Sequence, residues 1–153
     1  MRFMVLMIPG DRKNVEAGVM PDQKLISAMM KYNEDLAKAG VLLALDGLQP
    51  SSKGARIRFS GGKRIVTDGP FTEAREVIGG YWLWQVKSKA EAIEWASRCP
   101  AAEGDTLEVR QVYEMSDFGP EVERREGALA DQIGKRVEEN KQRTAPGTER
   151  KSR

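Results

Sequence analysis

Hydrophobic and polar positions in the first third of the chain predict a strand, a helix and a second strand. Residues 2–8 form a nearly continuous apolar run, typical of a strand that is central in a sheet or buried on both faces. The polar stretch 10–20 predicts a loop. A helix is expected to begin at the N-cap Asp22 and to stop at Gly40, and residues 41–45 follow as a strand. The apolar positions of that helix are Leu25, Met29, Tyr32 and Leu36.

The middle of the chain predicts a β-hairpin. Ile57 and Phe59 alternate with arginines, which is the period of a strand. The pair Gly61-Gly62 supplies the positive φ angles of a tight turn, and residues 63–66 return as the second strand.

A strand, a helix and a last strand follow the hairpin. Residues 81–86 are rich in aromatic side chains and read as a strand. Ser88 and Glu91 have the spacing of a capping box, so a helix is expected from there until Pro100. Residues 106–113 are predicted as the last strand.

This order of elements predicts an α+β fold. Strand, helix and strand, an inserted hairpin, and again strand, helix and strand form the ferredoxin-like split β-α-β arrangement, with an antiparallel sheet and two helices on one face. The other face then lacks a cover. Residues 81–84 are apolar on both sides of their strand, so we expect a homodimer through the sheet faces, an arrangement that can enclose a central cavity.

The chain is expected to consist of one domain, residues 1–116, and a charged tail, residues 117–153. A thin apolar stripe in the tail predicts an arm-like helix, either solvated or bound to a partner, and residues 141–147 are expected to fray or to be disordered. The stripe consists of Val122, Leu129, Ile133 and Val137.

Composition narrows the chemistry. Hydrophobic residues make up 40% and charged residues 31% of the 153 residues, as in a soluble globular protein. The absence of histidine excludes Ser-His-Asp and Cys-His catalysis and nearly all usual zinc and non-haem iron sites, so no metal or cofactor is expected. Cys99 is the only cysteine and is interpreted as inert core.

Charge and hydropathy bear on nucleic-acid binding and on the cellular location of the protein. The net charge of +2 comes from interleaved basic and acidic residues, which gives no footprint for nucleic acid. No stretch approaches the roughly 20 apolar residues that span a bilayer, and the N-terminal run lacks the features of a signal peptide. We therefore expect a cytoplasmic protein without a membrane partner.

The stretch 67–76 is the one segment that does not read as scaffold. Asp-Gly-Pro cannot continue a helix or a central strand, so Asp68 is predicted at a turn or loop rim. Its carboxylate is a candidate general base or an anchor for a polar ligand group, and the alternative is an Asx-turn cap. The residues expected to contact a ligand are Asp68, Gly69, Pro70, Phe71, Arg75, Tyr81 and Arg110.

Each other candidate has two interpretations. Arg75 with the neighbouring glutamates clamps a carboxylate-bearing ligand or forms solvated ion pairs. Arg110 on the last strand is a possible partner of Asp68. The Tyr81 hydroxyl donates to a ligand or to the backbone. Trp82 and Trp84 form an aromatic wall for a ligand or pack in the core or dimer.

The motif resembles the DGPF branch of the YCII-related domain family. The matching residues are 66–71, Glu73, Arg75, Glu76 and 79–81, and the likeness covers roughly residues 1–115. The resemblance implies dimeric α/β barrels of ferredoxin-like subunits. The YCII branch carries a suggested His-Asp pair, of which Asp68 alone has a counterpart here. The DGPF branch is often a genomic companion of extracytoplasmic-function sigma factors, which implies a regulatory setting.

Three functions follow as hypotheses. The first is a small cofactor-independent enzyme, or a binding protein, that takes a metabolite near the DGPF loop. The second is a non-catalytic dimeric module in sigma-factor-linked stress regulation. The third, nucleic-acid binding, lacks the aromatic and basic signature of RNA-binding sheets and is the least favoured.

Overall fold

The computed structural model describes residues 1–144 of the chain. The chain is α+β and divides into two compact units, Met1–Val112 and a second unit that begins at Tyr113. Among the described residues no helix combines the length and the hydropathy that crossing a membrane requires.

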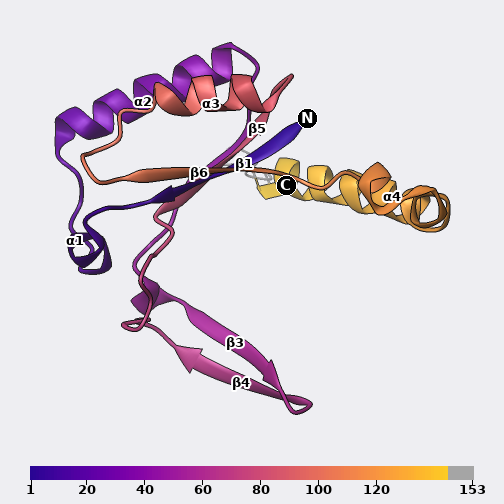
Figure 1. Cartoon of the computed structure of the whole chain (residues 1–153), viewed down its shortest axis with the longest axis horizontal. Coiled ribbons are helices and arrows are strands. Elements are labelled where there is room, and N and C mark those ends of the chain that lie inside the picture. Colours follow the sequence, from indigo (N-terminus) through magenta and orange to yellow (C-terminus); the bar gives the residue numbers. More distant parts are fainter. Residues whose placement is uncertain (145–153) are drawn as a thin grey trace, which may run out of the picture. The chain divides into compact units, whose positions relative to one another are not determined.

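A four-stranded antiparallel sheet forms the centre of the first unit (Figure 1). Its strand order is β2-β5-β1-β6, so β5 and β1 are the inner strands. The strands are β1 (Arg2–Ile8), β2 (Leu42–Gly47), β5 (Gly80–Gln85) and β6 (Thr106–Gln111). The predicted strands are confirmed, with ends displaced by one or two residues. The inner position of β1 agrees with its continuous apolar run.

The helices α2 (Gln23–Lys38) and α3 (Lys89–Ser97) lie on one face of this sheet (Figure 1). Both begin at the predicted caps. The Asp22 carboxylate accepts a hydrogen bond from the Leu25 amide at 2.8 Å, and the Ser88 hydroxyl accepts one from the Glu91 amide at 3.1 Å.

The loop predicted over residues 10–20 is wrong in part, because it contains the short helix α1 (Arg12–Glu16). The Asp11 carboxylate caps this helix by accepting a hydrogen bond from the Asn14 amide at 3.1 Å. A five-residue polar helix buries no side chain, so it leaves no hydrophobic period in the sequence.

The core lies between the sheet and these two helices. Its largest fully buried side chains are Trp84, Phe3, Leu36 and Val5. Trp82 is also buried and donates its indole N–H to the Asn33 side-chain oxygen at 2.8 Å. Core packing is therefore the interpretation that holds for Trp82 and Trp84.

The opposite face of the sheet has no helix of the first unit against it (Figure 1). Because side chains alternate along a strand, the residues between the core positions point to this open face. Met4 pairs with Leu83, and Leu6 pairs with Tyr81, all four half-buried. As expected, both helices α2 and α3 lie on one side of the sheet, and the other side carries these half-buried side chains.

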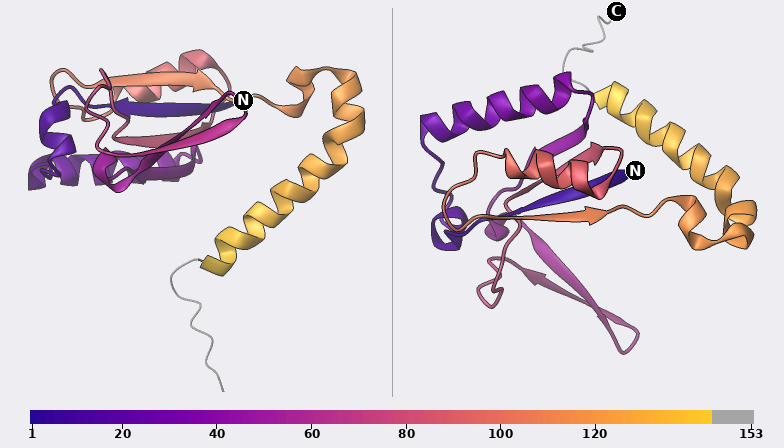
Figure 2. Two further views of the ribbon diagram at one scale, coloured as in Figure 1. Left: turned by 90° about the horizontal axis from the view of Figure 1, so that it is seen from below. Right: turned by 45° about the horizontal axis from the view of Figure 1, so that its top comes forward.

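The strands β3 (Ala55–Ser60) and β4 (Lys63–Asp68) form the predicted hairpin as a separate two-stranded sheet. Gly61 and Gly62 adopt φ angles of 56° and 72° at its turn, as expected. The hairpin extends away from the four-stranded sheet (Figure 1, and the right-hand view of Figure 2), and both of its strands are exposed throughout. A 3-10 turn, η1 (Ser51–Lys53), precedes it.

The second unit consists of a 3-10 turn, η2 (Met115–Phe118), and the helix α4 (Pro120–Thr144). The predicted helical arm is thus confirmed. Fraying was expected from residue 141, but residues 141–144 continue the helix. The remainder of that predicted stretch lies outside the described residues.

Burial predicts a sharp contrast between two residues of α2. Replacing the fully buried Leu36 by alanine should lower the free energy of unfolding by about 2–5 kcal/mol, because it leaves a cavity under the sheet. Replacing Met30, which is 65% exposed, should cost less than about 0.5 kcal/mol. Urea unfolding of both variants measures the difference, and equal effects would contradict this description of the core.

Candidate functional site

The DGPF segment is a loop that joins the hairpin to strand β5. It leaves β4 at Asp68, contains a cis Gly69–Pro70 peptide bond, and reaches the sheet at Gly80. At the base of the hairpin the Gly69 amide donates to the Gly54 carbonyl at 2.9 Å. A Cβ atom on Gly69 would lie 1.8 Å from the Ser51 carbonyl oxygen, so the backbones approach too closely there for any side chain.

Ser51 connects this loop to helix α1. Its hydroxyl oxygen accepts a hydrogen bond from the Phe71 amide at 3.0 Å and donates its proton to the Glu16 carboxylate. The Ser51 amide donates to the other oxygen of Glu16 at 3.0 Å. These bonds lower the pKa of Glu16, since they favour its ionised form. Three segments that are distant in sequence therefore meet at one hydroxyl group.

Two arginine side chains contact the loop. The Arg12 guanidinium donates to the Thr72 carbonyl at 2.8 Å. The Arg56 guanidinium lies 4.0 Å from the centre of the Phe71 ring, a cation–π contact between the hairpin and the loop. Phe71 itself is half-buried. The loop is thus fixed at both its backbone and its aromatic residue.

Asp68 is the last residue of β4, opposite Ala55, and its side chain is exposed. Among residues 1–144 its carboxylate has no hydrogen bond or ion pair, so the Asx-turn cap does not form. The close contact of Gly69 with Ser51 already fixes the corner that a cap was expected to fix. The Asp68 carboxylate is therefore unengaged.

Arg75 and the two glutamates beside it are also exposed and have no ion pair within the described part of the chain. The solvated ion pairs considered for this cluster are thus not observed. Pro70 is exposed too.

Arg110 does not meet Asp68, which corrects that expectation. Arg110 lies opposite Met4 on the open face of the four-stranded sheet, whereas Asp68 belongs to the separate hairpin. The guanidinium forms an exposed ion pair with Glu108 at 3.6 Å. Residues two apart in a strand share a face, so Glu108 is placed beside Arg110 by the strand itself.

Tyr81 donates its hydroxyl proton to the Asp46 carboxylate at 2.7 Å. The two residues pair across β5 and β2 on the open face. The bond to Asp46 raises the pKa of Tyr81, because a neutral phenol is needed to donate it. Within the described residues the partner of this hydroxyl is a side chain and not the backbone.

Sequence reasoning missed Asp46, Glu16 and Ser51. Asp46 had a signal, since it is a carboxylate that directly follows the apolar run 41–45. Glu16 and Ser51 had none, because they lie 35 residues apart and only the fold brings them together.

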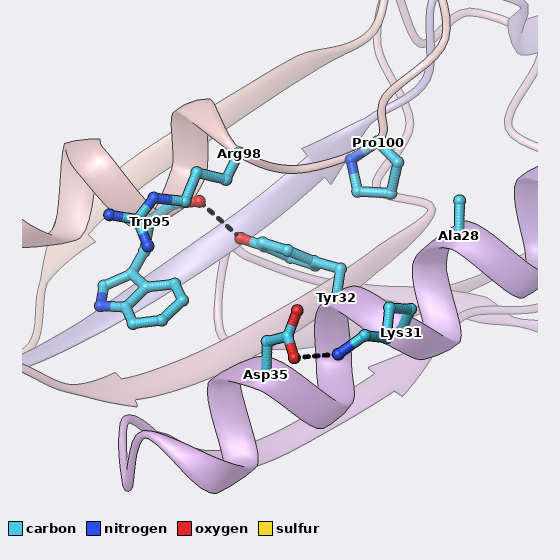
Figure 3. A pocket seen from close by; sticks show the side chains of 7 residues that line it. All are labelled: Ala28, Lys31, Tyr32, Asp35, Trp95, Arg98 and Pro100. Atoms are coloured by element: carbon cyan, nitrogen blue, oxygen red, sulfur yellow. Dashed lines mark hydrogen bonds and ion pairs between the residues drawn. The ribbon is translucent and has the colours of Figure 1, made fainter.

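A cleft of the first unit lies elsewhere, between α2 and α3, and has a volume of about 470 Å³ (Figure 3). The Tyr32 hydroxyl donates to the Trp95 carbonyl at 2.8 Å inside it, and the Arg98 guanidinium lies 4.6 Å from the Trp95 ring centre. Residues 68–71 do not line it. Its lining residues are Ala28, Lys31, Tyr32, Asp35, Trp95, Arg98 and Pro100.

Cys99 is half-buried near this cleft, and burial raises the pKa of its thiol to about 11. The thiol is therefore protonated at neutral pH, in agreement with an inert cysteine. Within residues 1–144, no three of the carboxylate and thiol side chains gather closely enough to hold a metal ion.

Comparison with known proteins identifies the family. The model of the YCII-related domain matches residues 1–116, and the chain belongs to this family. A protein of Rhizobium meliloti (strain 1021), itself described as uncharacterised, is 32% identical over 75 residues. The match covers 49% of this chain and 60% of that relative, so the chain spans about 60% of the length of the curated relative.

Removing the Ser51 hydroxyl should loosen the loop. Ser51→Ala deletes the acceptor of the Phe71 amide and a donor to Glu16, so the local opening free energy should fall by about 1 kcal/mol, roughly five-fold in amide exchange. Amide exchange of Phe71, followed by NMR, measures this. Ser52→Ala is the matched control, since the Ser52 hydroxyl makes no hydrogen bond among the described residues. Equal exchange in both variants would contradict the proposed anchor.

The same contact should depend on pH. Because the folded pKa of Glu16 lies below its ordinary value of 4.5, the contact is fully present above that pH and is lost as the pH falls through the lower, folded value. The Phe71 amide shift should therefore titrate below pH 4.5 in the native protein. The shift should not change with pH in Glu16→Gln. It should titrate as in the native protein in the control Glu76→Gln, because the Glu76 carboxylate has no partner within residues 1–144.

Proposed function

We propose that the protein is a DGPF-branch member of the YCII-related family that binds a small metabolite as a homodimer. The subunit is proposed to be ferredoxin-like and to pair through its open sheet face into a dimeric α/β barrel. The functional domain is residues 1–116, with 117–153 as its tail, and the proposed setting is the cytoplasm. No cofactor, nucleic acid or membrane enters this proposal.

The open sheet face is the observation that carries the proposal. Met4, Leu6 and Leu83 form an apolar centre on it, next to the Tyr81–Asp46 pair. Apolar surfaces of this kind are unusual on monomers and common at interfaces. A second copy supplies a cover of the same chemistry, as a two-fold dimer requires. The strand order β2-β5-β1-β6 with both helices on the other face supports the ferredoxin-like subunit.

The polar groups near the DGPF loop support a ligand at one end of that face. Tyr81 and Asp46 lie at the end of the sheet where the loop enters β5, one residue after Gly80 in the case of Tyr81. A metabolite with an apolar body and a polar group would contact the sheet through its body and these residues through its polar end. Arg110 offers a cation on the same face for an anionic group.

In the proposed site the Asp68 carboxylate is the group that interacts with the polar part of the ligand. Its unengaged carboxylate is able to accept a hydrogen bond or a proton from the ligand, on a loop whose backbone is held by Gly69 and Ser51. Phe71, Pro70 and Arg75 then form the rim around it. In a cofactor-independent enzyme Asp68 would be the base, and in a binding protein it would be the anchor.

A non-catalytic regulatory module is the second candidate. The exposure of Asp68 and Arg75, and the position of the cleft between α2 and α3 away from the loop, favour recognition by another macromolecule over an enclosed reaction site. This candidate agrees with the sigma-factor association of the DGPF branch. It requires the same dimer, so the two candidates differ in the ligand and not in the assembly.

The dimer proposal predicts that a charge on the open face separates the subunits. Leu83→Lys places an ammonium group in the apolar centre, so the dissociation constant should rise by about 100-fold or more. Sedimentation velocity measures it, and circular dichroism verifies the fold. Met30→Lys adds the same charge on the exposed side of α2 and should leave the dimer intact. A native protein that sediments as a monomer at all concentrations would overturn the dimer.

The ligand proposal is tested by screening metabolites for thermal stabilisation of the native protein, Asp68→Asn and Asp46→Asn. A true ligand of this site should lose at least about ten-fold in affinity in Asp68→Asn, because a charged hydrogen-bond partner is removed. Glu76→Gln, on the same loop, should respond like the native protein. Hits that stabilise all four proteins equally would exclude the Asp68 site while leaving the dimer unaffected.

A further inference from the structure

Helix α4 lies outside the residues matched by the family model and carries exposed apolar side chains. It runs for 25 residues from Pro120, a residue favoured at the first helical position. Glutamates occupy its first turn, and Lys141 and Arg143 its last, as the helix dipole favours. The helix is therefore locally well specified, although no other element among the described residues of the second unit covers its length.

An apolar stripe follows one side of α4. Val122, Leu129, Ile133 and Val137 are between 39% and 54% exposed. Positions separated alternately by four and three residues form a straight line on a helix, as in a coiled coil. In α4 one such line, here called the seam, consists of Val122, Glu126, Leu129, Ile133, Arg136 and Asn140. It contains three of the four apolar residues, and Val137 lies directly beside it.

Two opposite charges interrupt the apolar residues of the seam. Neither Glu126 nor Arg136 has an ion pair among the described residues. Glu126 also has no cation at a distance of three or four residues, because Val122, Glu123, Leu129 and Ala130 occupy those positions. Ion pairs form elsewhere on α4, between Arg124 and Glu121 and between Lys141 and Glu138. The seam charges are thus available to a partner.

We propose that α4 pairs in antiparallel orientation with α4 of a second copy of this chain, with the two-fold axis at the level of residue 131. In this register Glu126 of each copy meets Arg136 of the other, and Leu129 meets Ile133 of the other. Both unpaired charges obtain an opposite partner, and the two largest apolar residues of the seam form the central layers.

The residues beside the seam match the same register. Arg125 and Glu139 flank the seam on the same side, near opposite ends of the helix. In an antiparallel pair Arg125 of one copy therefore meets Glu139 of the other. On the other side Ala130 faces Ala130 of the second copy, where a small side chain permits close approach. In a parallel pair Glu126 would face Glu126 and Arg136 would face Arg136, which charge repulsion disfavours.

The pairing does not depend on the proposed sheet dimer. It uses residues of the second unit alone, and its short seam with two charged layers predicts modest affinity by itself. If the open sheet faces also hold two copies together, the helices gain effective concentration and the pair becomes much tighter. Either contact can fail without the other.

A cysteine reporter tests the pairing in the full-length chain. In a Cys99→Ser background, Ala130→Cys gives each chain one thiol. Across the proposed axis this thiol lies beside the thiol at position 130 of the second chain. Mild oxidation should link the two chains, and the rate should exceed that of the control reporter Glu138→Cys on the opposite side of α4 by at least about ten-fold. A parallel pair would instead link Glu126→Cys to itself rapidly and leave Ala130→Cys slow, which would overturn the proposed orientation.

Charge exchange tests the register with the same reporter. Glu126→Arg replaces two attractive contacts by two repulsive ones, so the linking rate should fall about five-fold or more. The exchange Glu126→Arg with Arg136→Glu should restore it. Glu138→Arg makes the same change in charge away from the seam and should leave it unaltered. Equal rates for Glu126→Arg and Glu138→Arg, or no rescue by the exchange, would refute the Glu126–Arg136 contact.

Discussion

The first unit depends on burying one face of the β1–β5 strand pair. Phe3, Val5 and Trp84 become inaccessible only because α2 and α3 lie across them, and both helices therefore occupy the same side. Two helices cannot also cover the reverse side. The packing that stabilises the first unit thus leaves one apolar sheet face without a helix of that unit against it, and the proposed assembly and ligand site are based on this face.

The DGPF loop is specified by backbone contacts more than by its own side chains. Gly69 fits against the Ser51 carbonyl, and the Ser51 hydroxyl holds the Phe71 amide while it donates to Glu16. The Asp68 carboxylate has no part in this arrangement. Like Arg75 and the glutamates beside it, Asp68 has no polar side-chain partner within residues 1–144, and a charged group in that state is available to a ligand.

The sequence was most informative where a residue acts on its immediate neighbours. Asp22 and Ser88 cap the helices expected of them, and Gly61-Gly62 turns the hairpin, since each of these depends on only a few adjacent residues. It failed where contacts span the chain. Glu16 and Ser51 meet 35 residues apart, and Arg110 pairs along its own strand instead of with Asp68. The helical and strand periods of hydrophobic residues report local structure and contain no information on such long-range contacts.

Substitutions in the hairpin and substitutions in the core are expected to have different effects on stability. All twelve of its strand residues are exposed, and it joins the four-stranded sheet only at its base, so substitutions near Gly61 hardly touch the folding equilibrium of the core. Side chains on these two strands can therefore be exchanged without removing a contact inside the four-stranded sheet.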